Sequence, residues 1–285
     1  MKDREGRPFP AAGLRRDERG VWRLPQERDR EISYPEDGHD RCYAVEESSF
    51  WFSHRNSVIT TVVRRFPPAG AMLDVGGGNG FVTMALGKAG FDAWLVEPGY
   101  GGCLNAVERG VETVVNARLE ELSIAEGTVG GIGLFDVIEH LRRPEGLLRE
   151  AARTLCDGGR LYVTVPAHDW LWSHADVRAG HFRRYGPAAL RRALDGAGLE
   201  TEYHTFFFSF MAAPLFIMRT LPHRLGLGRT DADEKTRLSE TRADHAPKKG
   251  PAGMLMEALF KRELAVIDGS RMGHGTSLLA VGRRR

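Results

Sequence analysis

Residues 72–81 read MLDVGGGNGF, a short apolar run that ends in a cluster of glycines. This pattern predicts a buried strand that turns tightly into a helix, because glycine adopts backbone conformations that other residues avoid and lets the main chain approach a ligand closely. The free N–H groups at the start of the following helix can then bind an anionic group of a nucleotide. Several classes of nucleotide site use such a turn, so the spacing of the glycines has to discriminate between them.

Two of these classes do not fit the spacing. A phosphate loop needs Gly-Lys-Ser/Thr at its end, whereas Gly80 is followed by Phe81 and Val82. A dinucleotide fingerprint that begins with Gly76 and Gly78 needs a third glycine where Phe81 stands. A tight turn that only requires small residues is the structural alternative. The spacing that does fit is Asp-x-Gly-x-Gly-x-Gly, formed by Asp74, Gly76, Gly78 and Gly80.

Strand and helix patterns alternate along most of the chain, which indicates βαβ units and a parallel sheet covered on both faces. The predicted strands are 71–75, 92–97, 112–116, 131–136, 160–165, 199–208 and 277–282. The predicted helices are 44–66, 80–89, 101–109, 145–155, 187–198 and 254–267. We therefore predict a Rossmann-like, doubly wound α/β fold with a seven-stranded, mostly parallel sheet, an N-terminal helical cover and an insertion before the last strand.

We expect a mobile arm at 1–30 and a single domain at 31–285. The loop at 228–251 is charged and almost free of large apolar residues, so we expect it to be flexible and without a catalytic role. Within the domain we expect a helical lid at 31–68, a cofactor-binding core at 69–205, a substrate-cover insertion with a helix at 206–270, and a final strand with a basic, solvated tail at 271–285.

Composition excludes several classes of function. The net charge of +2, with acids scattered among the basic residues, does not indicate a nucleic-acid partner. Cys42, Cys103 and Cys156 lie far apart, which argues against a disulfide framework and favours a reducing cytoplasm. The longest apolar stretch, 206–218, is shorter than the roughly 20 residues of a spanning helix. We expect the segment 206–221 to enclose an apolar acceptor, to contact a membrane surface peripherally, or to form a homodimer contact.

Four motifs occur in register. The glycine turn is followed by AWLVEPG, in which Glu97 ends the second strand, and then by ARLEELS around Leu119. IGLFDVIEHL follows at 132–141, with PEGLLREAARTLCDGGRLYVTVP after it. Together these motifs resemble the class I S-adenosylmethionine-dependent methyltransferases, in particular the small-molecule and quinone-biosynthesis O-methyltransferase-like branch, over about residues 50–200.

This resemblance implies S-adenosyl-L-methionine as the cofactor and suggests which residues bind it. Glu97 matches the family's glutamate that accepts hydrogen bonds from both ribose hydroxyls, and the alternative is that it caps the next helix. Glu120 matches an acidic residue near the adenine. The implied cofactor-binding residues are Asp74, Gly76, Gly77, Gly78, Gly80, Glu97, Pro98, Leu119, Glu120 and Asp136.

In an open parallel sheet, ligands bind beyond the carboxyl ends of the strands, so the residues after the fourth and fifth strands face the reacting methyl group. A histidine there suits removal of a proton from an acceptor hydroxyl. We expect His140 to be this base, with His168 and His181 as further candidates; the alternative for Glu139 and His140 is that they only cap the next helix. The expected substrate-contacting residues are Trp51, Glu139, Asp169, Trp172, Arg183, Arg184 and Tyr185.

Two further segments keep alternatives open. Arg183 and Arg184 can bind an anionic substrate, or they can pair with Asp176 and fix their own loop. The consecutive aromatic residues 50–52 cannot all face one side of a helix. They form either a lid over cofactor and substrate or a packed helix joint.

A metal site built from Glu139, His140 and Asp169 is an alternative to a protein base, but the ligand spacing is not clear and we assign no metal ligands. The function predicted from the sequence is methyl transfer to a small-molecule acceptor, with oxygen as the expected acceptor atom. N- or C-methylation, or a cofactor-binding scaffold without catalysis, are the alternatives.

Overall fold

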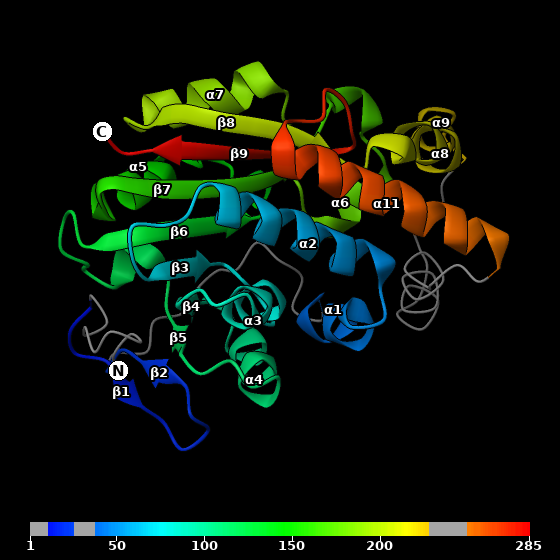
Figure 1. Cartoon of the computed structure of the whole chain (residues 1–285). Helices are drawn as coiled ribbons and strands as arrows, with labels where there is room; N and C mark the ends of the chain where they lie inside the picture. Colours follow the sequence, from blue (N-terminus) through cyan, green and yellow to red (C-terminus); the bar gives the residue numbers. More distant parts are fainter. Residues whose placement is uncertain (1–10, 26–37, 228–249) are drawn as a thin grey trace.

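The computed structural model describes residues 11–25, 38–227 and 250–285, and its centre is one twisted sheet (Figure 1). The seven expected strands are all present and run parallel to one another, except for the last, which is antiparallel to both of its neighbours. In spatial order they are β5 (Val114–Asn116), β4 (Ala93–Val96), β3 (Met72–Val75), β6 (Val129–Phe135), β7 (Leu155–Pro166), β9 (Ser277–Arg283) and β8 (Glu200–Phe207). This topology confirms the predicted doubly wound fold.

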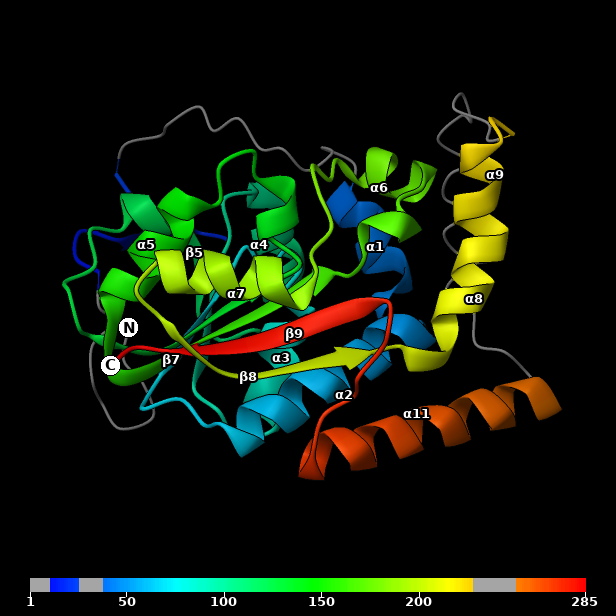
Figure 2. The same ribbon diagram turned by 90° about the horizontal axis from the view of Figure 1, so that it is seen from above.

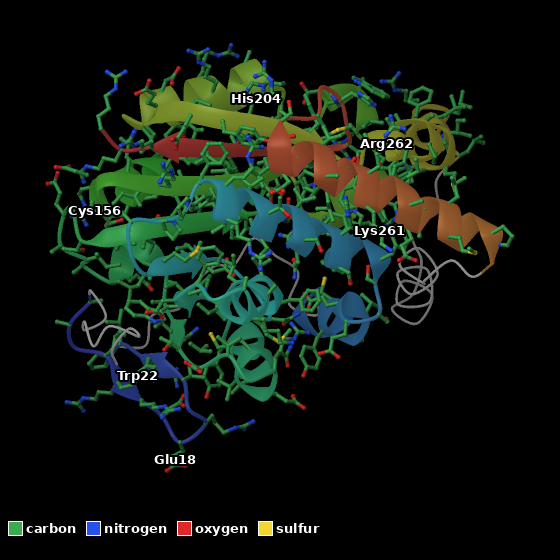
Figure 3. The ribbon with its side chains drawn as sticks, viewed as in Figure 1. Glu18, Trp22, Cys156, His204, Lys261 and Arg262 are labelled. Carbon is green, nitrogen blue, oxygen red and sulfur yellow. The ribbon has the colours of Figure 1, made fainter. Side chains whose placement is uncertain are left out.

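Two further strands extend the sheet, and both lie in the segment 1–30 that we expected to be a mobile arm. β1 (Arg15–Arg16) pairs with β2 (Trp22–Arg23), and β2 runs parallel to β5. The turn between them is fixed by Asp17, whose carboxylate accepts hydrogen bonds from the backbone N–H of Val21 and from the Tyr100 hydroxyl. Figure 3 shows Trp22 on this hairpin, at one edge of the molecule. Residues 1–10 and 26–37 lie outside the described part of the chain.

Helices cover both faces of the sheet, because successive side chains of each buried strand point to opposite sides. Met72 packs toward α2, α3 and α11, whereas its neighbour Leu73 packs toward α5 and α7. Figure 2 shows α7 and α2 on opposite sides of β8 and β9. The main helices are α1 (Gly38–Glu46), α2 (Phe50–Arg65), α3 (Phe81–Lys88), α4 (Tyr100–Glu108), α5 (Glu145–Thr154), α7 (Pro187–Gly196) and α11 (Pro251–Gly269).

The helix expected at 44–66 is divided into α1 and α2. Ser49 caps α2, because its hydroxyl accepts hydrogen bonds from the backbone N–H groups of Trp51 and Phe52. The helix ends before Pro67 and Pro68, as the sequence predicts. The break lets α2 cross the sheet while α1 contacts α4.

The insertion after β8 is mostly helical. It comprises η4 (Ser209–Met211), α8 (Ala212–Leu215), the π-helix η5 (Phe216–Thr220) and α9 (Leu221–Arg224). The charged loop expected at 228–251 falls outside the described residues up to position 249. Within the described ranges, no helix is both long and apolar enough to cross a membrane.

The basic tail is more fixed than expected. Arg284 donates hydrogen bonds to the backbone carbonyls of Arg153 and Leu155 and to the Glu126 carboxylate. The Arg284 guanidinium group therefore connects the residue after β9 to the junction of α5 and β7.

Candidate active site

The glycine turn forms one wall of a cavity of about 780 Å³ at the carboxyl ends of β3, β4 and β6. Gly78 has a φ of 55°, and its N–H donates a 2.9 Å hydrogen bond to the carboxylate of Glu97. Gly77 is required for packing, because a Cβ there would lie 2.6 Å from the Asp74 carboxylate. The turn is thus shaped around two buried acids, Asp74 and Glu97.

Burial raises the pKa of both acids above the usual range of a carboxyl group. Burial raises the pKa of Glu97 to about 7, against the hydrogen bonds from the Gly99 and Gly78 backbone, and the nearby Asp74 carboxylate raises it further. Burial also raises the pKa of Asp74 to about 6, although the Thr83 hydroxyl donates a 2.6 Å hydrogen bond to it. A ligand that donates hydrogen bonds to Glu97 would therefore favour its ionised form.

A buried ion pair lies between this turn and the far side of the cavity. The Arg55 side chain extends from α2, and its Nε donates a 2.5 Å hydrogen bond to Asp136 while Nη2 donates to the Phe135 carbonyl. Asp136 has a φ of 58°, a left-handed conformation at the end of β6 that turns its carboxylate into the cavity. The cavity therefore offers a cation and an anion within one short stretch of its wall.

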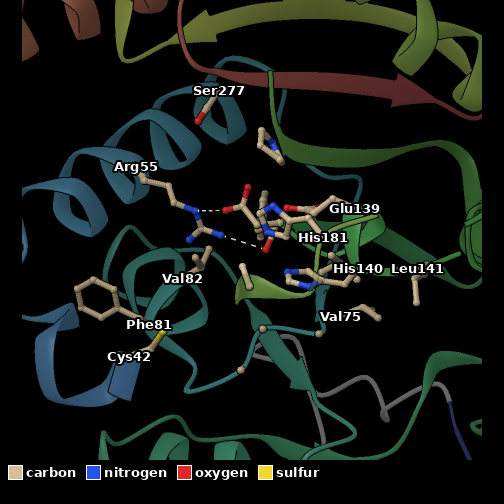
Figure 4. A pocket seen from close by; sticks show the side chains of 18 of the residues that line it. Cys42, Arg55, Val75, Phe81, Val82, Glu139, His140, Leu141, His181 and Ser277 are labelled. Carbon is tan, nitrogen blue, oxygen red and sulfur yellow. Dashed lines mark hydrogen bonds and ion pairs between the residues drawn. The ribbon is translucent and has the colours of Figure 1, made fainter. Parts of the chain in front are cut away.

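Three predicted side chains converge beyond Asp136, as Figure 4 shows for Glu139, His140 and His181. One ligand atom from each of the three lies within 4.8 Å of the other two. The two imidazole rings meet edge to face, with their centroids 4.7 Å apart. Glu139 and His140 come from η2 (Ile138–His140), whereas His181 follows α6 (His174–Ala179).

Glu139 and His140 are both buried enough to prefer their neutral forms. Neither carboxylate oxygen of Glu139 has a hydrogen-bond partner among the described residues. Burial, together with the Asp136 carboxylate, raises the pKa of Glu139 well above its usual value. Burial and the neighbouring His181 lower the pKa of His140 to about 4. His140 is thus a neutral imidazole near pH 7.

His181 has a different setting, because Asp176 orients it. The imidazole Nδ1 lies 3.0 Å from the Asp176 carboxylate, which also accepts two hydrogen bonds from the Arg184 guanidinium. Burial alone would raise the pKa of Asp176, but the contacts with His181 and Arg184 lower it to about 2. The alternative of loop fixation by Arg184 is therefore realised, and Arg184 also lines the cavity.

Several predicted residues lie outside the cavity lining. His168 stacks on Phe206 with centroids 5.1 Å apart, and Arg183 donates hydrogen bonds to the Leu141 and Arg142 carbonyls. Gly80 begins α3 with a φ of 70°. The predicted residues that do not line the cavity are His168, Asp169, Trp172, Arg183, Tyr185 and Gly80. Those that do are Trp51, Asp74, Gly76, Gly77, Gly78, Glu97, Pro98, Leu119, Glu120, Asp136, Glu139, His140, His181 and Arg184.

The group of possible metal ligands differs from the expected one in its third residue. The sequence suggests Asp169 beside Glu139 and His140, whereas the structure brings His181 to this position. Asp169 begins the short helix η3 (Asp169–Leu171) and is exposed. One carboxylate and two imidazoles form a donor set suited to a divalent cation.

The sequence predicts a substrate cover at 206–270, but it does not name the individual residues that close the cavity. Phe208, Met211, Leu215 and Arg219 come from the segment after β8, and Arg55 comes from α2. A helical pattern places such residues on an element, but it does not say which face meets a cavity. The sequence indicates Arg55 only as a basic residue that follows the aromatic residues 50–52 on the same predicted helix.

The cover is held against α2 by a buried hydrogen bond between two side chains. His54 Nε2 lies 2.6 Å from the Glu263 carboxylate of α11, which also accepts hydrogen bonds from the backbone N–H groups of Phe208 and Ser209. Trp51 stacks on Phe208 with centroids 5.3 Å apart. Trp51 therefore both lines the cavity and packs the joint between lid and insertion.

Comparison with known proteins shows which family has this arrangement. A family model described as "Methyltransferase domain" matches residues 51–204, more than half of the chain. The chain belongs to the class I S-adenosylmethionine-dependent methyltransferases. S-adenosylmethionine is therefore the cofactor of this methyltransferase, and the resemblance to the family is confirmed, while the O-methyltransferase-like branch stays a prediction. No curated protein matches the chain.

Solved structures share the fold of this methyltransferase at low sequence identity. A putative methyltransferase from Haloferax volcanii, solved in complex with the Trm112 activator, has a TM-score of 0.55 and 16% identity, over 87% of this chain and 96% of that one. A possible histamine N-methyltransferase from Thermotoga maritima has a TM-score of 0.53 and 16% identity, over 87% and 95%. Phosphoethanolamine N-methyltransferase 2 from Haemonchus contortus has a TM-score of 0.53 and 15% identity, over 89% and 58%.

Proposed function

We propose that this methyltransferase transfers the methyl group of S-adenosylmethionine to a hydroxyl oxygen of a small-molecule acceptor. The observation that carries this proposal is one cavity that joins the glycine turn and Glu97 to the cluster of Glu139, His140 and His181. Its volume of about 780 Å³ is in the range of a site for a cofactor and a small ligand. Methyl transfer is an in-line displacement, so alignment of two ligands in one cavity supplies much of the rate.

The cofactor is assigned by charge and hydrogen bonding. In this proposal Glu97, once ionised, accepts hydrogen bonds from the two ribose hydroxyls, and Glu120, which also lines the cavity, contacts the adenine. Arg55 and Asp136 then complement the carboxylate and the ammonium of the methionyl part, because their ion pair offers one charge of each sign. This order along the wall directs the sulfonium methyl group toward Glu139, His140 and His181.

The acceptor hydroxyl loses its proton to His181 in this proposal. Asp176 is ionised and accepts a hydrogen bond from His181 Nδ1–H, which leaves Nε2 free to take the proton. The oxygen lone pair forms the new C–O bond as the C–S bond breaks, and S-adenosylhomocysteine leaves as a neutral thioether. The pKa of about 4 makes His140 a weak base. We therefore propose His181, which Asp176 orients, in place of His140, the base expected from the sequence.

A second role for the same cluster is to hold a divalent cation. The two Glu139 oxygens are buried without a hydrogen-bond partner in the described chain, and they lie beside two imidazoles. A cation there would compensate the buried carboxylate and would lower the pKa of an acceptor hydroxyl that approached it. Isothermal titration with Mn²⁺ tests this role: binding to the wild type that is lost in Glu139→Gln supports it, and equal heats for both proteins reject it.

Methyl transfer is tested with tritiated S-adenosylmethionine and matched sets of phenols, catechols, carboxylic acids and amines. Label transferred to oxygen, with His181→Ala inactive and still able to bind the cofactor, supports the proposal. Label on nitrogen or carbon would establish one of the alternatives. Cofactor binding without transfer to any class would favour a scaffold.

A further inference from the structure

Exposed aliphatic side chains gather at one end of the molecule. In Figures 1 and 2, α8 and α9 lie at the same end as the first turns of α11. Monomeric proteins rarely expose many large apolar side chains in one place unless the surface binds something. Six aliphatic side chains of these elements expose between 62% and 74% of their surface: Ile217, Met218, Leu225, Leu227, Met254 and Leu255. We call these six residues the apolar end.

This position differs from the surface suggested by the sequence. The segment 206–221 was expected to enclose an apolar acceptor, to contact a membrane or to contact another copy, and its first residues Phe206, Phe207 and Phe208 are buried. The exposed part begins at Ile217 and continues past residue 221 to Leu227.

An aromatic side chain and basic groups border the apolar end. Trp170 is 45% exposed, and its ring lies 5.8 Å from that of Phe216. Arg224 donates a hydrogen bond to the Trp170 carbonyl, and its guanidinium lies 5.7 Å from the Phe216 ring. Tryptophan with an apolar body and a polar N–H is typical of side chains at the boundary between lipid and water.

Charge identifies the kind of surface that fits. Residues 209–227 read SFMAAPLFIMRTLPHRLGL, which contains two arginines and a histidine and no acidic residue. Figure 3 shows Lys261 and Arg262 farther along α11, where Lys261 forms an exposed ion pair with Glu257 and Arg262 is a further exposed basic group. An apolar face bordered by basic groups is complementary to a membrane whose headgroups are anionic, because both the burial of apolar area and the attraction of charge favour binding.

The apolar end is also continuous with the cavity. Met211, Leu215 and Arg219 line the cavity, while Ile217 and Met218 of the same helical segment are exposed. The segment therefore contributes side chains both to the substrate site and to the outer surface. A surface that bound the outer side would lie next to the cover of the cavity.

We propose that the apolar end docks on an anionic lipid bilayer without crossing it. Ile217, Met218 and Leu225 enter the boundary between headgroups and acyl chains, together with Met254 and Leu255 of α11. Trp170 and Arg224 lie at the level of the headgroups. The cavity cover then faces the bilayer, so that an apolar acceptor dissolved in the membrane has a short path to the cavity. Docking itself is independent of the proposed methyl transfer to oxygen.

Flotation of the full chain with vesicles tests the proposal. We expect binding to vesicles of phosphatidylcholine with phosphatidylglycerol to be about tenfold stronger than to phosphatidylcholine alone, and to weaken with salt. The combined change Ile217→Ser, Met218→Ser and Leu225→Ser should lower binding at least tenfold. Phe182→Ser is the matched control, because Phe182 is also an exposed apolar residue but packs on Arg142 and does not belong to the apolar end.

Cofactor binding and circular dichroism verify that each variant is folded. Should the triple variant fail to fold, Met254→Ser with Leu255→Ser tests the same surface from α11. Failure of the wild type to bind either vesicle, or equal binding of wild type and variants, overturns the proposal. Dimerisation in sedimentation velocity that the triple variant abolishes, with no vesicle binding, would assign the apolar end to a second copy. If the wild type binds vesicles but transfers no methyl group to oxygen, the proposed function is rejected and the docking proposal stands.

Discussion

The two halves of the cavity are built in different ways. The half that we propose for the cofactor comes from one strand–turn–helix unit, β3 to α3, and from the end of the next strand, where Glu97 lies. The acceptor half is assembled from η2, the loop after α6 and the insertion after β8, which are far apart in the sequence. Backbone geometry therefore determines the cofactor half, whereas tertiary packing determines the acceptor half. This difference separates changes that affect binding from changes that affect chemistry.

The largest expected effect is on the acceptor half. His181→Ala should lower kcat by about 10²–10⁴-fold, because removal of a positioned general base costs this much. The Kd for S-adenosylmethionine should stay unchanged, and isothermal titration checks it. His168→Ala is the control, since His168 lies outside the cavity lining. Equal losses of kcat in both variants would contradict the division of the cavity into two halves.

The next effect belongs to the cofactor half. Glu97→Ala removes a carboxylate that we assign to two ribose hydroxyls, so the Kd for S-adenosylmethionine should rise about 10²-fold. Glu120→Ala should raise the Kd less, because Glu120 is exposed at the cavity wall. A Glu97→Ala protein that is folded and binds the cofactor as tightly as the wild type would refute the assignment.

A smaller effect concerns the joint between the two halves. His54→Ala removes the buried hydrogen bond between His54 and the Glu263 carboxylate, so the free energy of unfolding should fall by about 1–3 kcal/mol. Urea unfolding measures this change. Lys261→Ala, which removes an exposed ion pair with Glu257 on the same helix, should leave the midpoint unchanged. A similar loss in both variants would mean that α11 is simply sensitive to substitution.

The smallest effect is a pH dependence of cofactor affinity. The pKa of about 7 for Glu97 means that its proton must leave before the carboxylate accepts the ribose hydroxyls. Affinity should therefore rise with pH up to about 7, by at most about tenfold per unit, and level off above it. Glu97→Gln should flatten the part of this profile that lies between pH 6 and 7. An unchanged profile would assign the titration to another group, such as Asp74.

The sequence predicts the fold, and the glycine turn that lines the cavity, for a physical reason. The strands are buried on both faces, so they read as continuous apolar runs, and the glycine spacing is a local requirement of the turn. β1 and β2 could not be predicted, because two-residue strands have no period and depend on pairing with β5. The approach of His181 to His140 depends on how the loop after β7 folds back, and no local pattern records this.

Arg55 and Arg184 show the same limit at the level of single residues. Arg55 lies on a predicted helix and Arg184 on the loop after β7. The guanidinium group of Arg55 pairs with the Asp136 carboxylate, and that of Arg184 pairs with the Asp176 carboxylate. The sequence does not decide whether Arg184 binds an anionic substrate or Asp176, because either partner can accept hydrogen bonds from a guanidinium group. Only the position of α6 decides between them.

The place of β9 has a consequence for how the chain folds during synthesis. β9 lies between β7 and β8, and in the described sheet β8 pairs with no other strand. A ribosome therefore has to deliver residues 277–283 before β8 can join the sheet. Until then β7 has an open edge and the cover after β8 has no anchor. We expect this methyltransferase to acquire its acceptor half last, when translation of the domain is complete.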